Sequence, residues 1–134
     1  MVRIGTTVYF EAAHRQLNDP SKCGKLHGHN WKVDVEIESD DINEIGYVVD
    51  FKEVGAICNR YDHAVILVKD DPLVNVLMRM DQKVVVMEKN PTCENLAMEI
   101  AECIAMVLEN NKVYLDGLKV VVWENEKSFA VTEW

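Results

Sequence analysis

The sequence predicts an α+β fold in which an antiparallel four-stranded sheet carries two main helices on one face. Segments that alternate apolar and polar residues lie near both ends of the chain, and two amphipathic segments with helical spacing lie between them. Because strands and helices segregate along the chain, their order favours this class over a strictly alternating parallel α/β fold. The 134 residues, of which 49% are hydrophobic, suffice for one domain with its own core, residues 1–134.

The first two segments predict a β-hairpin. Residues 2–12 place Phe10 and Ala12 on an apolar face, with polar residues on the other face. Residues 29–38 alternate more strictly, with Trp31 and the other apolar residues at odd positions. A period of two is that of a strand with one buried face, so we expect these segments to pair.

Caps and apolar spacing predict the two helices. Asp50, followed three residues later by Glu53, has the pattern of a capping box at the start of the first helix. Thr92, directly after Pro91, is the expected N-cap of the second helix, which ends near the sequence ENN. Residues 73–80 indicate a further short helical segment.

Three shorter segments are expected to be strands: residues 84–87, 117–124 and 129–133. In the second of them, Glu124 falls on the apolar face that Val122 defines. A carboxylate on that face costs free energy unless it has a partner. Glu124 therefore either lies at the solvated end of its strand or binds a ligand that presents N–H donors.

A small sheet with helices on a single face leaves edges and a surface uncovered, so the sequence predicts a homo-oligomer. A net charge of −9 argues against nucleic acid as a partner, because phosphates need an excess of lysine and arginine. No apolar run approaches the ~20 residues of a membrane span, and the N-terminus lacks the features of a signal peptide. The four cysteines form no CxxC pair, which indicates reduced thiols and a cytoplasmic location.

Three of the four histidines, His14, His27 and His29, lie around the connection of the predicted hairpin. His14 continues the even register of Phe10, and the other two share the odd register of Trp31. Because residues i and i+2 of a strand point to the same side, all three rings can face one pocket. Three neutral imidazoles with an open fourth position suit a catalytic Zn²⁺ ion, so we expect zinc here. The alternative is three separate histidines, each hydrogen-bonded near a sheet edge.

Two further groups have more than one interpretation. Cys23, four residues before His27, is either a fourth ligand of a closed structural site or a free thiol beside the metal that acts as base or nucleophile. Asp62 could orient the adjacent His63 for proton transfer, although such a pair is also common in loops. The spacing leaves these alternatives open.

Six motifs cover nearly the whole chain: FEAAH (10–14), CGKLHGHN (23–30), VVDF (48–51), DH (62–63), PTCENLA (91–97) and VVVWE (120–124). In identity and order they resemble the 6-pyruvoyl-tetrahydropterin synthase family, and within it the 6-carboxytetrahydropterin synthases of 7-deazaguanine biosynthesis. The three-residue gap between Cys23 and HGH is similar to that of the carboxy-type enzymes. Tyr61 and Cys93 depart from the family pattern, which usually has Leu at the first position and Thr, Ser or Ala at the second.

The resemblance implies a role for each polar residue. His14, His27 and His29 would hold Zn²⁺, and Cys23 would be a catalytic base rather than a ligand. Asp62 and His63 would form a proton relay. Glu124 would anchor the pterin ring, and Thr92 and Glu94 would line the pterin pocket. The triphosphate needs cations, and three lie beside the site in the sequence: Arg15, Lys22 and Lys25.

The resemblance also implies the reaction and the assembly. The substrate would be 7,8-dihydroneopterin triphosphate, and the products 6-carboxy-5,6,7,8-tetrahydropterin, acetaldehyde and triphosphate, on the way to queuosine or archaeosine. The family's tunnelling fold forms barrels by oligomerisation, as trimers that stack into hexamers with active sites between subunits.

Two alternatives remain: a 6-pyruvoyl-tetrahydropterin synthase that uses the same residues, and a non-catalytic zinc-binding oligomer with Cys23 as the fourth ligand. A zinc hydrolase is disfavoured because the sequence has no HExxH motif.

Overall fold

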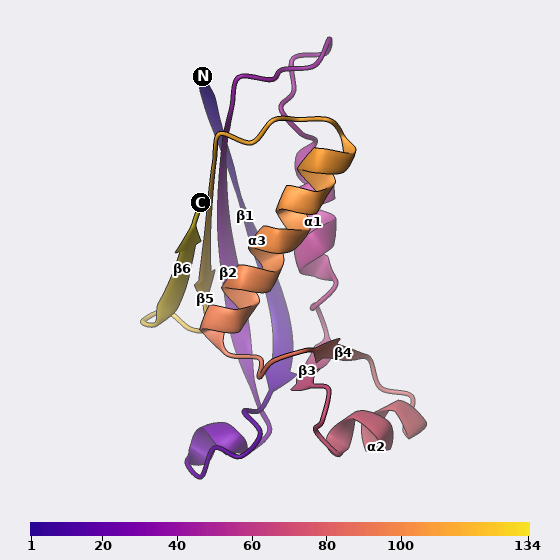
Figure 1. The fold of residues 1–134 in the computed structure, drawn as a ribbon. Helices are drawn as coiled ribbons and strands as arrows, with labels where there is room; N and C mark the ends of the chain where they lie inside the picture. Colours follow the sequence, from indigo (N-terminus) through magenta and orange to yellow (C-terminus); the bar gives the residue numbers. More distant parts are fainter.

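A six-stranded sheet with helices on one face forms the structure, a computed structural model that describes residues 1–134 (Figure 1). In chain order the elements are β1 (Val2–His14), the 3-10 turn η1 (Lys22–Gly24), β2 (His27–Ser39), α1 (Phe51–Asn59), β3 (Ala64–Val68), α2 (Leu73–Arg79), β4 (Val84–Met87), α3 (Cys93–Asn110), β5 (Gly117–Trp123) and β6 (Phe129–Glu133). The predicted α+β class is confirmed, and every predicted strand and helix is present.

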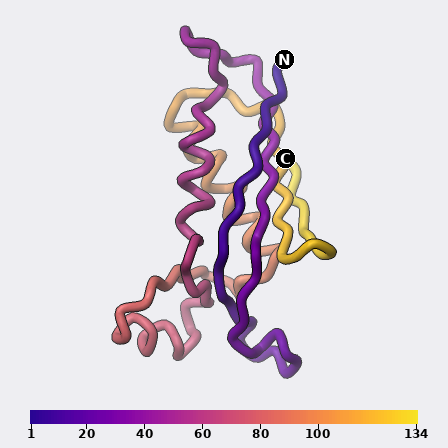
Figure 2. Tube along the Cα trace, turned by 180° about the vertical axis from the view of Figure 1, so that it is seen from behind, coloured from indigo at the N-terminus to yellow at the C-terminus, as the bar shows by residue number.

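The predicted hairpin is confirmed and is longer than expected. β1 and β2 pair antiparallel over their full length, from Val2 opposite Ser39 to His14 opposite His27. Both strands continue past the strictly alternating segment, and the added residues include His14 and His27. Their connection, residues 15–26, lies at the end of the hairpin far from the N-terminus of the chain (Figures 1 and 2).

The predicted four-stranded antiparallel sheet is wrong, because the sheet has six strands and is mixed. Its order is β4-β3-β1-β2-β5-β6, with β3 parallel to β1 and β4 parallel to β3. The strand that the prediction missed is β3, whose sequence AVILV has no polar residue to mark a period of two. Such a run is typical of a parallel strand that is covered on both faces. Within β3 the adjacent residues Ile66 and Leu67, which point to opposite faces, are both fully buried.

Helices α1 and α3 cover one face of the sheet, as predicted, and the core lies between them and the long strands (Figure 1). The apolar stripe of α3 is at most 1% exposed and consists of Leu96, Ile100, Ile104 and Leu108. From behind, no helix lies in front of β1 and β2, so the opposite face of these strands is uncovered (Figure 2). None of the helices is long and apolar enough to span a lipid bilayer.

Both predicted helix caps form. The Asp50 carboxylate accepts a hydrogen bond from the first turn of α1 at 2.9 Å, and Thr92 Oγ1 accepts one from the backbone N–H of Asn95 at 3.1 Å. The reciprocal half of the predicted capping box is absent, because the Glu53 carboxylate accepts from the side chain of Asn111. Glu53 therefore joins α1 to the end of α3 instead of closing its own helix start.

An ion pair holds the connection that follows β1. Arg15 donates to both carboxylate oxygens of Asp71, with Nε at 2.7 Å. The Asp71 side chain is fully buried, and it also accepts from the backbone N–H of Leu73. The hydrogen bond from Arg15 is the largest cause that lowers the pKa of Asp71 below its ordinary value. The pair thus fixes the end of β1 relative to the start of α2.

Replacement of Ile104 by alanine should lower the free energy of unfolding by about 2–5 kcal/mol, because it leaves a cavity under the sheet. Met106, which is 62% exposed on the same helix, is the control, and Met106→Ala should change that free energy by at most ~0.5 kcal/mol. Equilibrium chemical denaturation measures both values. Equal losses in the two variants would show that this face of α3 does not pack on the sheet.

Replacement of Asp71 by asparagine should lower the free energy of unfolding at pH 7 by about 3 kcal/mol, because Arg15 loses its buried partner. The pKa of Asp71 is lower in the folded chain, so its contribution is present above the ordinary value of 3.8 and is lost as the pH falls below it. Chemical denaturation of the wild type and of Asp71→Asn should therefore give free energies of unfolding whose difference becomes smaller from pH 7 to pH 3. A difference independent of pH would contradict this role of the ion pair.

Candidate functional site

The three predicted histidines meet where β1 ends and β2 begins. Their ring centroids are 4.7 Å apart for His14 and His27, 5.1 Å for His14 and His29, and 4.8 Å for His27 and His29. His14 is opposite His27 in the ladder, and His29 is opposite Ala12, whose small side chain leaves room for the rings. The convergence that strand parity predicted is confirmed.

Backbone carbonyls orient two of the rings. His14 Nδ1 lies 2.7 Å from the carbonyl oxygen of Pro91, and His27 Nδ1 lies 2.6 Å from that of Lys25. Because a carbonyl only accepts, each Nδ1 carries the proton and each Nε2 of a neutral ring keeps its lone pair. The Nε2 atoms of His14 and His29 are buried without a hydrogen-bond partner. Bare nitrogens of this kind fit a metal ion.

Burial favours the neutral form of His14 and of His29. Desolvation is the largest cause that lowers the pKa of His14 and of His29, and it outweighs the opposing effects of the Pro91 carbonyl and of Glu124. The His14 side chain is fully buried, and the Trp31 ring packs edge-on against it at a centroid distance of 4.9 Å. Neutral imidazole is the form that binds metals.

Glu124 joins the three histidines. Its Oε1 lies 3.0 Å from His29 Nε2 and 3.3 Å from His14 Nε2. One ligand atom from each of His14, His27, His29 and Glu124 lies within 4.8 Å of the others. Glu124 follows β5 on the face of Val122, as its parity predicted. These four residues, the histidine–glutamate group, could hold a metal ion.

Cys23 lies in η1, on the connection between the histidine-bearing strands, and is not a member of the histidine–glutamate group. Its carbonyl accepts from the backbone N–H of Gln16 at 3.0 Å, and its own N–H donates to Ser21 Oγ at 3.2 Å. A Cβ atom on Gly24 would lie 2.0 Å from the carbonyl oxygen of Asp19, so only glycine fits this turn. The partly exposed thiol is therefore carried by a tightly folded loop.

Asp62 and His63 form the predicted pair but are also outside the histidine–glutamate group. Asp62 Oδ1 lies 3.1 Å from His63 Nδ1 and accepts from the backbone N–H of Glu11 at 3.0 Å. The bond from Glu11 is the largest cause that lowers the pKa of Asp62. The His63 side chain is 78% exposed, in an open hollow that Glu11 and Lys83 also line. Within one chain, this pair faces solvent.

The predicted substrate contacts lie near the start of α3 and on the loop before β2. Thr92 caps α3 directly after Pro91, and Glu94 is exposed in the first turn of that helix. The Lys25 side chain is exposed, while its carbonyl orients His27. The start of α3 thus borders the histidines through Pro91.

Sequence reasoning missed the contacts that join the histidines to α3. The Asn90 side chain accepts from the backbone N–H of Leu17 at 2.9 Å and donates to the Leu17 carbonyl at 3.2 Å. Gln16 Nε2 donates to the Pro91 carbonyl at 3.5 Å, and Gln16 Oε1 is buried without a partner. Every residue has a backbone carbonyl, so nothing in the sequence marks Pro91 as the partner of His14.

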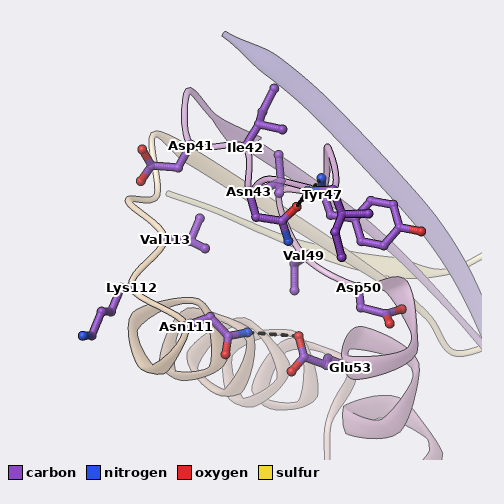
Figure 3. Close-up of a pocket in the computed structure, with 12 residues that line it drawn as sticks. Asp41, Ile42, Asn43, Tyr47, Val49, Asp50, Glu53, Asn111, Lys112 and Val113 are labelled. Carbon is purple, nitrogen blue, oxygen red and sulfur yellow. Dashed lines mark hydrogen bonds between the residues drawn. The ribbon is translucent and has the colours of Figure 1, made fainter.

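A cavity of about 730 Å³ lies at the other end of the molecule, between residues 41–53 and the end of α3 (Figures 1 and 3). Its carboxylates already have partners in the fold. Asp41 accepts from the backbone N–H of Tyr114 at 2.6 Å, and Glu53 accepts from Asn111 at 3.0 Å (Figure 3). No histidine or cysteine lines it, so the metal-binding chemistry belongs to the histidine–glutamate group.

Comparisons of the sequence with known proteins point to one family. The family model described as 6-pyruvoyl tetrahydropterin synthase matches residues 3–133. A Rickettsia bellii protein named 6-carboxy-5,6,7,8-tetrahydropterin synthase is 29% identical over 128 residues, which cover 90% of this chain and 93% of that protein. A Pyrococcus horikoshii protein provisionally given the same name is 34% identical over 141 residues, which cover 96% of this chain and 87% of that protein.

Solved structures share the fold at low sequence identity. A catalytic-residue variant of Plasmodium vivax 6-pyruvoyltetrahydropterin synthase matches with a TM-score of 0.71 at 19% identity, over 100% of this chain and 99% of that one. A Wolinella succinogenes protein described as uncharacterised matches with a TM-score of 0.74 at 23% identity, over 98% of this chain and 97% of that one. Since the family model covers nearly the whole chain, this chain belongs to the 6-pyruvoyl tetrahydropterin synthase family.

Proposed function

We propose that the protein is a zinc-dependent 6-carboxy-5,6,7,8-tetrahydropterin synthase. It would convert 7,8-dihydroneopterin triphosphate and one water molecule to 6-carboxy-5,6,7,8-tetrahydropterin, acetaldehyde and triphosphate. Family membership and relatives named for this activity at 29% and 34% identity support the proposal. The observation that carries it is the meeting of three imidazoles, two of them with bare buried Nε2 atoms, beside one carboxylate.

His14, His27 and His29 are the proposed zinc ligands. The carbonyls that hold Nδ1 of His14 and His27 fix the tautomer in which Nε2 is free to coordinate. Imidazole nitrogens suit Zn²⁺, whereas Mg²⁺ and Ca²⁺ prefer oxygen ligands. When bound, zinc would act as a Lewis acid that makes protons next to the side-chain hydroxyls of the substrate more acidic.

Cys23 is proposed as the base that takes a proton from the substrate side chain. Two observations support this role over that of a ligand: the thiol is outside the histidine–glutamate group, and it is partly exposed. A base must stay within hydrogen-bond reach of the proton that it removes. The contacts of Gln16 and Gly24 restrain the backbone that carries Cys23 and so support this requirement.

Asp62 and His63 are proposed to complete the proton relay. The Asp62 carboxylate holds His63 Nδ1, which leaves Nε2 to exchange a proton with the substrate. Because the His63 side chain is 78% exposed and outside the histidine–glutamate group, we propose that it serves a site shared with a neighbouring subunit. The relay would then depend on assembly.

The assembly proposed is that of the tunnelling fold, in which oligomerisation closes the sheets into a barrel of three subunits and barrels stack as hexamers. The open edge of the sheet supports it, because Phe129 and Val131 on β6 are 53% and 44% exposed and Trp134 beyond it is 55% exposed. We place the enzyme in the cytoplasm, which suits four cysteines that form no disulfide.

The pterin ring is proposed to bind between Glu124 and the start of α3. The Glu124 carboxylate would accept charge-assisted hydrogen bonds from the amino and ring N–H groups of the pterin. Thr92 and Glu94 would line this pocket, and the exposed Lys25 would contact the triphosphate. Arg15 is already paired with the buried Asp71, so we assign it no phosphate.

A pyruvoyl-type synthase is the second candidate, since the same residues would bind the same substrate. The three-residue gap between Cys23 and His27 favours the carboxy type. The non-catalytic zinc oligomer would need Cys23 as a ligand, and its absence from the histidine–glutamate group speaks against that arrangement.

Zinc-loaded protein incubated with 7,8-dihydroneopterin triphosphate should release acetaldehyde and 6-carboxytetrahydropterin in equal amounts, as measured by mass spectrometry. A chelator should abolish the reaction and added zinc should restore it, because the metal supplies the Lewis acid. His27→Ala should lose zinc and activity together. Triphosphate release without acetaldehyde would identify the pyruvoyl-type enzyme instead, and a zinc-loaded protein with no turnover would refute both.

Cys23→Ser should lower kcat at least ~100-fold at unchanged zinc content, because it removes a general base and no ligand. Cys103→Ala, which changes a partly exposed thiol on α3, is the matched control and should keep both zinc and activity. Metal analysis and initial rates measure the two properties. Loss of zinc in Cys23→Ser would assign Cys23 as a ligand and overturn its role as base.

A further inference from the structure

We propose that Glu124 is a fourth ligand of the metal in the substrate-free protein and that the arriving pterin withdraws it. One carboxylate would then serve two partners in turn, the metal and the pterin N–H groups. This inference rests on the proposed function for its second half only. The first half concerns the histidine–glutamate group itself and can be tested without turnover.

The contact between Glu124 and His14 requires a cation. His14 donates its Nδ1–H to the Pro91 carbonyl, so the neutral ring presents a lone pair at Nε2. Glu124 Oε1 lies 3.3 Å from that atom. Two acceptors that face one another at this distance repel unless a positive charge lies between them. A metal ion bound by both removes the repulsion.

The contact with His29 leads to the same conclusion. Its Nε2 lies 3.0 Å from the same oxygen of Glu124, yet this nitrogen is buried without a hydrogen-bond partner. Coordination of one ion by this nitrogen and the Glu124 oxygen accounts for the approach as well as a hydrogen bond does. A single carboxylate oxygen that faces two imidazole nitrogens has the arrangement of ligands around one ion.

No lysine or arginine compensates the charge of Glu124. Among side chains that can carry a positive charge, its carboxylate contacts only the neutral rings of His14 and His29, although it is just 25% exposed. A partly buried carboxylate without a cationic partner costs free energy. Its position is set by the backbone, because the Glu124 N–H donates to the Ser128 carbonyl at 3.1 Å where β5 turns into β6. The fold thus holds the carboxylate at the histidines before any substrate is present.

Glu124 takes its two roles in turn. The amino and ring N–H groups of the pterin would together engage both carboxylate oxygens. The side-chain shift that this two-point contact needs would take Oε1 off the metal and leave the fourth position to the substrate hydroxyls. Substrate binding and opening of the metal would therefore be one event. Closure by Glu124 would keep other small ligands off the metal until the pterin arrives.

Substitution of Co²⁺ for zinc gives a spectroscopic test of this closure. Imidazole is neutral, so the charge of Glu124 does not repel it, and its binding to Co²⁺ changes the visible spectrum. Imidazole should bind the cobalt form of Glu124→Ala at least about tenfold more tightly than the wild type. Glu126→Ala, an exposed carboxylate on the turn between β5 and β6, is the matched control and should behave as the wild type.

Zinc affinity, measured by competition with a chelator, provides a second readout. Glu124→Gln, which keeps the shape and removes the charged ligand, should bind zinc at least about tenfold more weakly than the wild type, since even outer partners of a metal site contribute that much. Thermal unfolding of the metal-free variants checks that both remain folded. Equal imidazole binding and equal zinc affinity in wild type and variants would overturn the proposal.

Addition of neopterin, an oxidised pterin with the same three-carbon side chain, tests the second half. It should change the visible spectrum of the wild-type cobalt site, because its side-chain hydroxyls replace Glu124 at the metal. Glu124→Ala should show no such change, because it lacks the carboxylate that binds the pterin. If the imidazole and zinc measurements give the expected results but neopterin has no effect, Glu124 is a metal ligand that the pterin does not displace. The second half of the proposal is then refuted. None of these measurements uses turnover, so their outcome is independent of the acetaldehyde assay that tests the proposed function.

Discussion

The pairing of His14 with His27 at the last position of the β1–β2 ladder is the constraint on which the site depends. A slip of one residue in this ladder would turn every side chain of one strand to the other face. The same register buries Phe10 and Trp31 under the helices and points the histidine rings toward one another. The core and the histidine–glutamate group therefore depend on the same backbone hydrogen bonds. A hairpin that is stable also holds the site residues in place.

Helix α3 supplies the second constraint. Its apolar stripe packs on the sheet, its start is capped by Thr92, and the preceding Pro91 gives its carbonyl to His14. Asn90 binds both backbone groups of Leu17, so the loop that carries Cys23 is tied to the same point. Packing of a helix thereby determines which nitrogen of His14 carries the proton. The site is thus linked to the packing of α3 through the Pro91 carbonyl and the side chain of Asn90.

The polar residues divide into an enclosed set and an exposed set. The histidine–glutamate group is gathered between the sheet and the start of α3, whereas Asp62 and His63 face solvent. The long strands have no helix over their outer face, and the apolar side chains of β6 stand at an open edge (Figure 2). One chain thus presents a group that could hold a metal ion and a separate, solvent-facing pair of Asp62 and His63, which is why the proposed mechanism needs a second subunit.

The sequence by itself determined every strand except β3, the helix caps and the facing of the chemical groups. A period of two places His14, His27, His29 and Glu124 on the inner face of their strands, because facing depends only on local backbone geometry. Only the tertiary structure decided how the strands outside the β1–β2 hairpin pair and which carbonyl meets which ring. The uniformly apolar β3 hides its parallel pairing with β1, and Pro91 reaches His14 across 77 residues. Such contacts depend on how the whole chain packs, and a carbonyl or an apolar run carries no mark of its eventual partner.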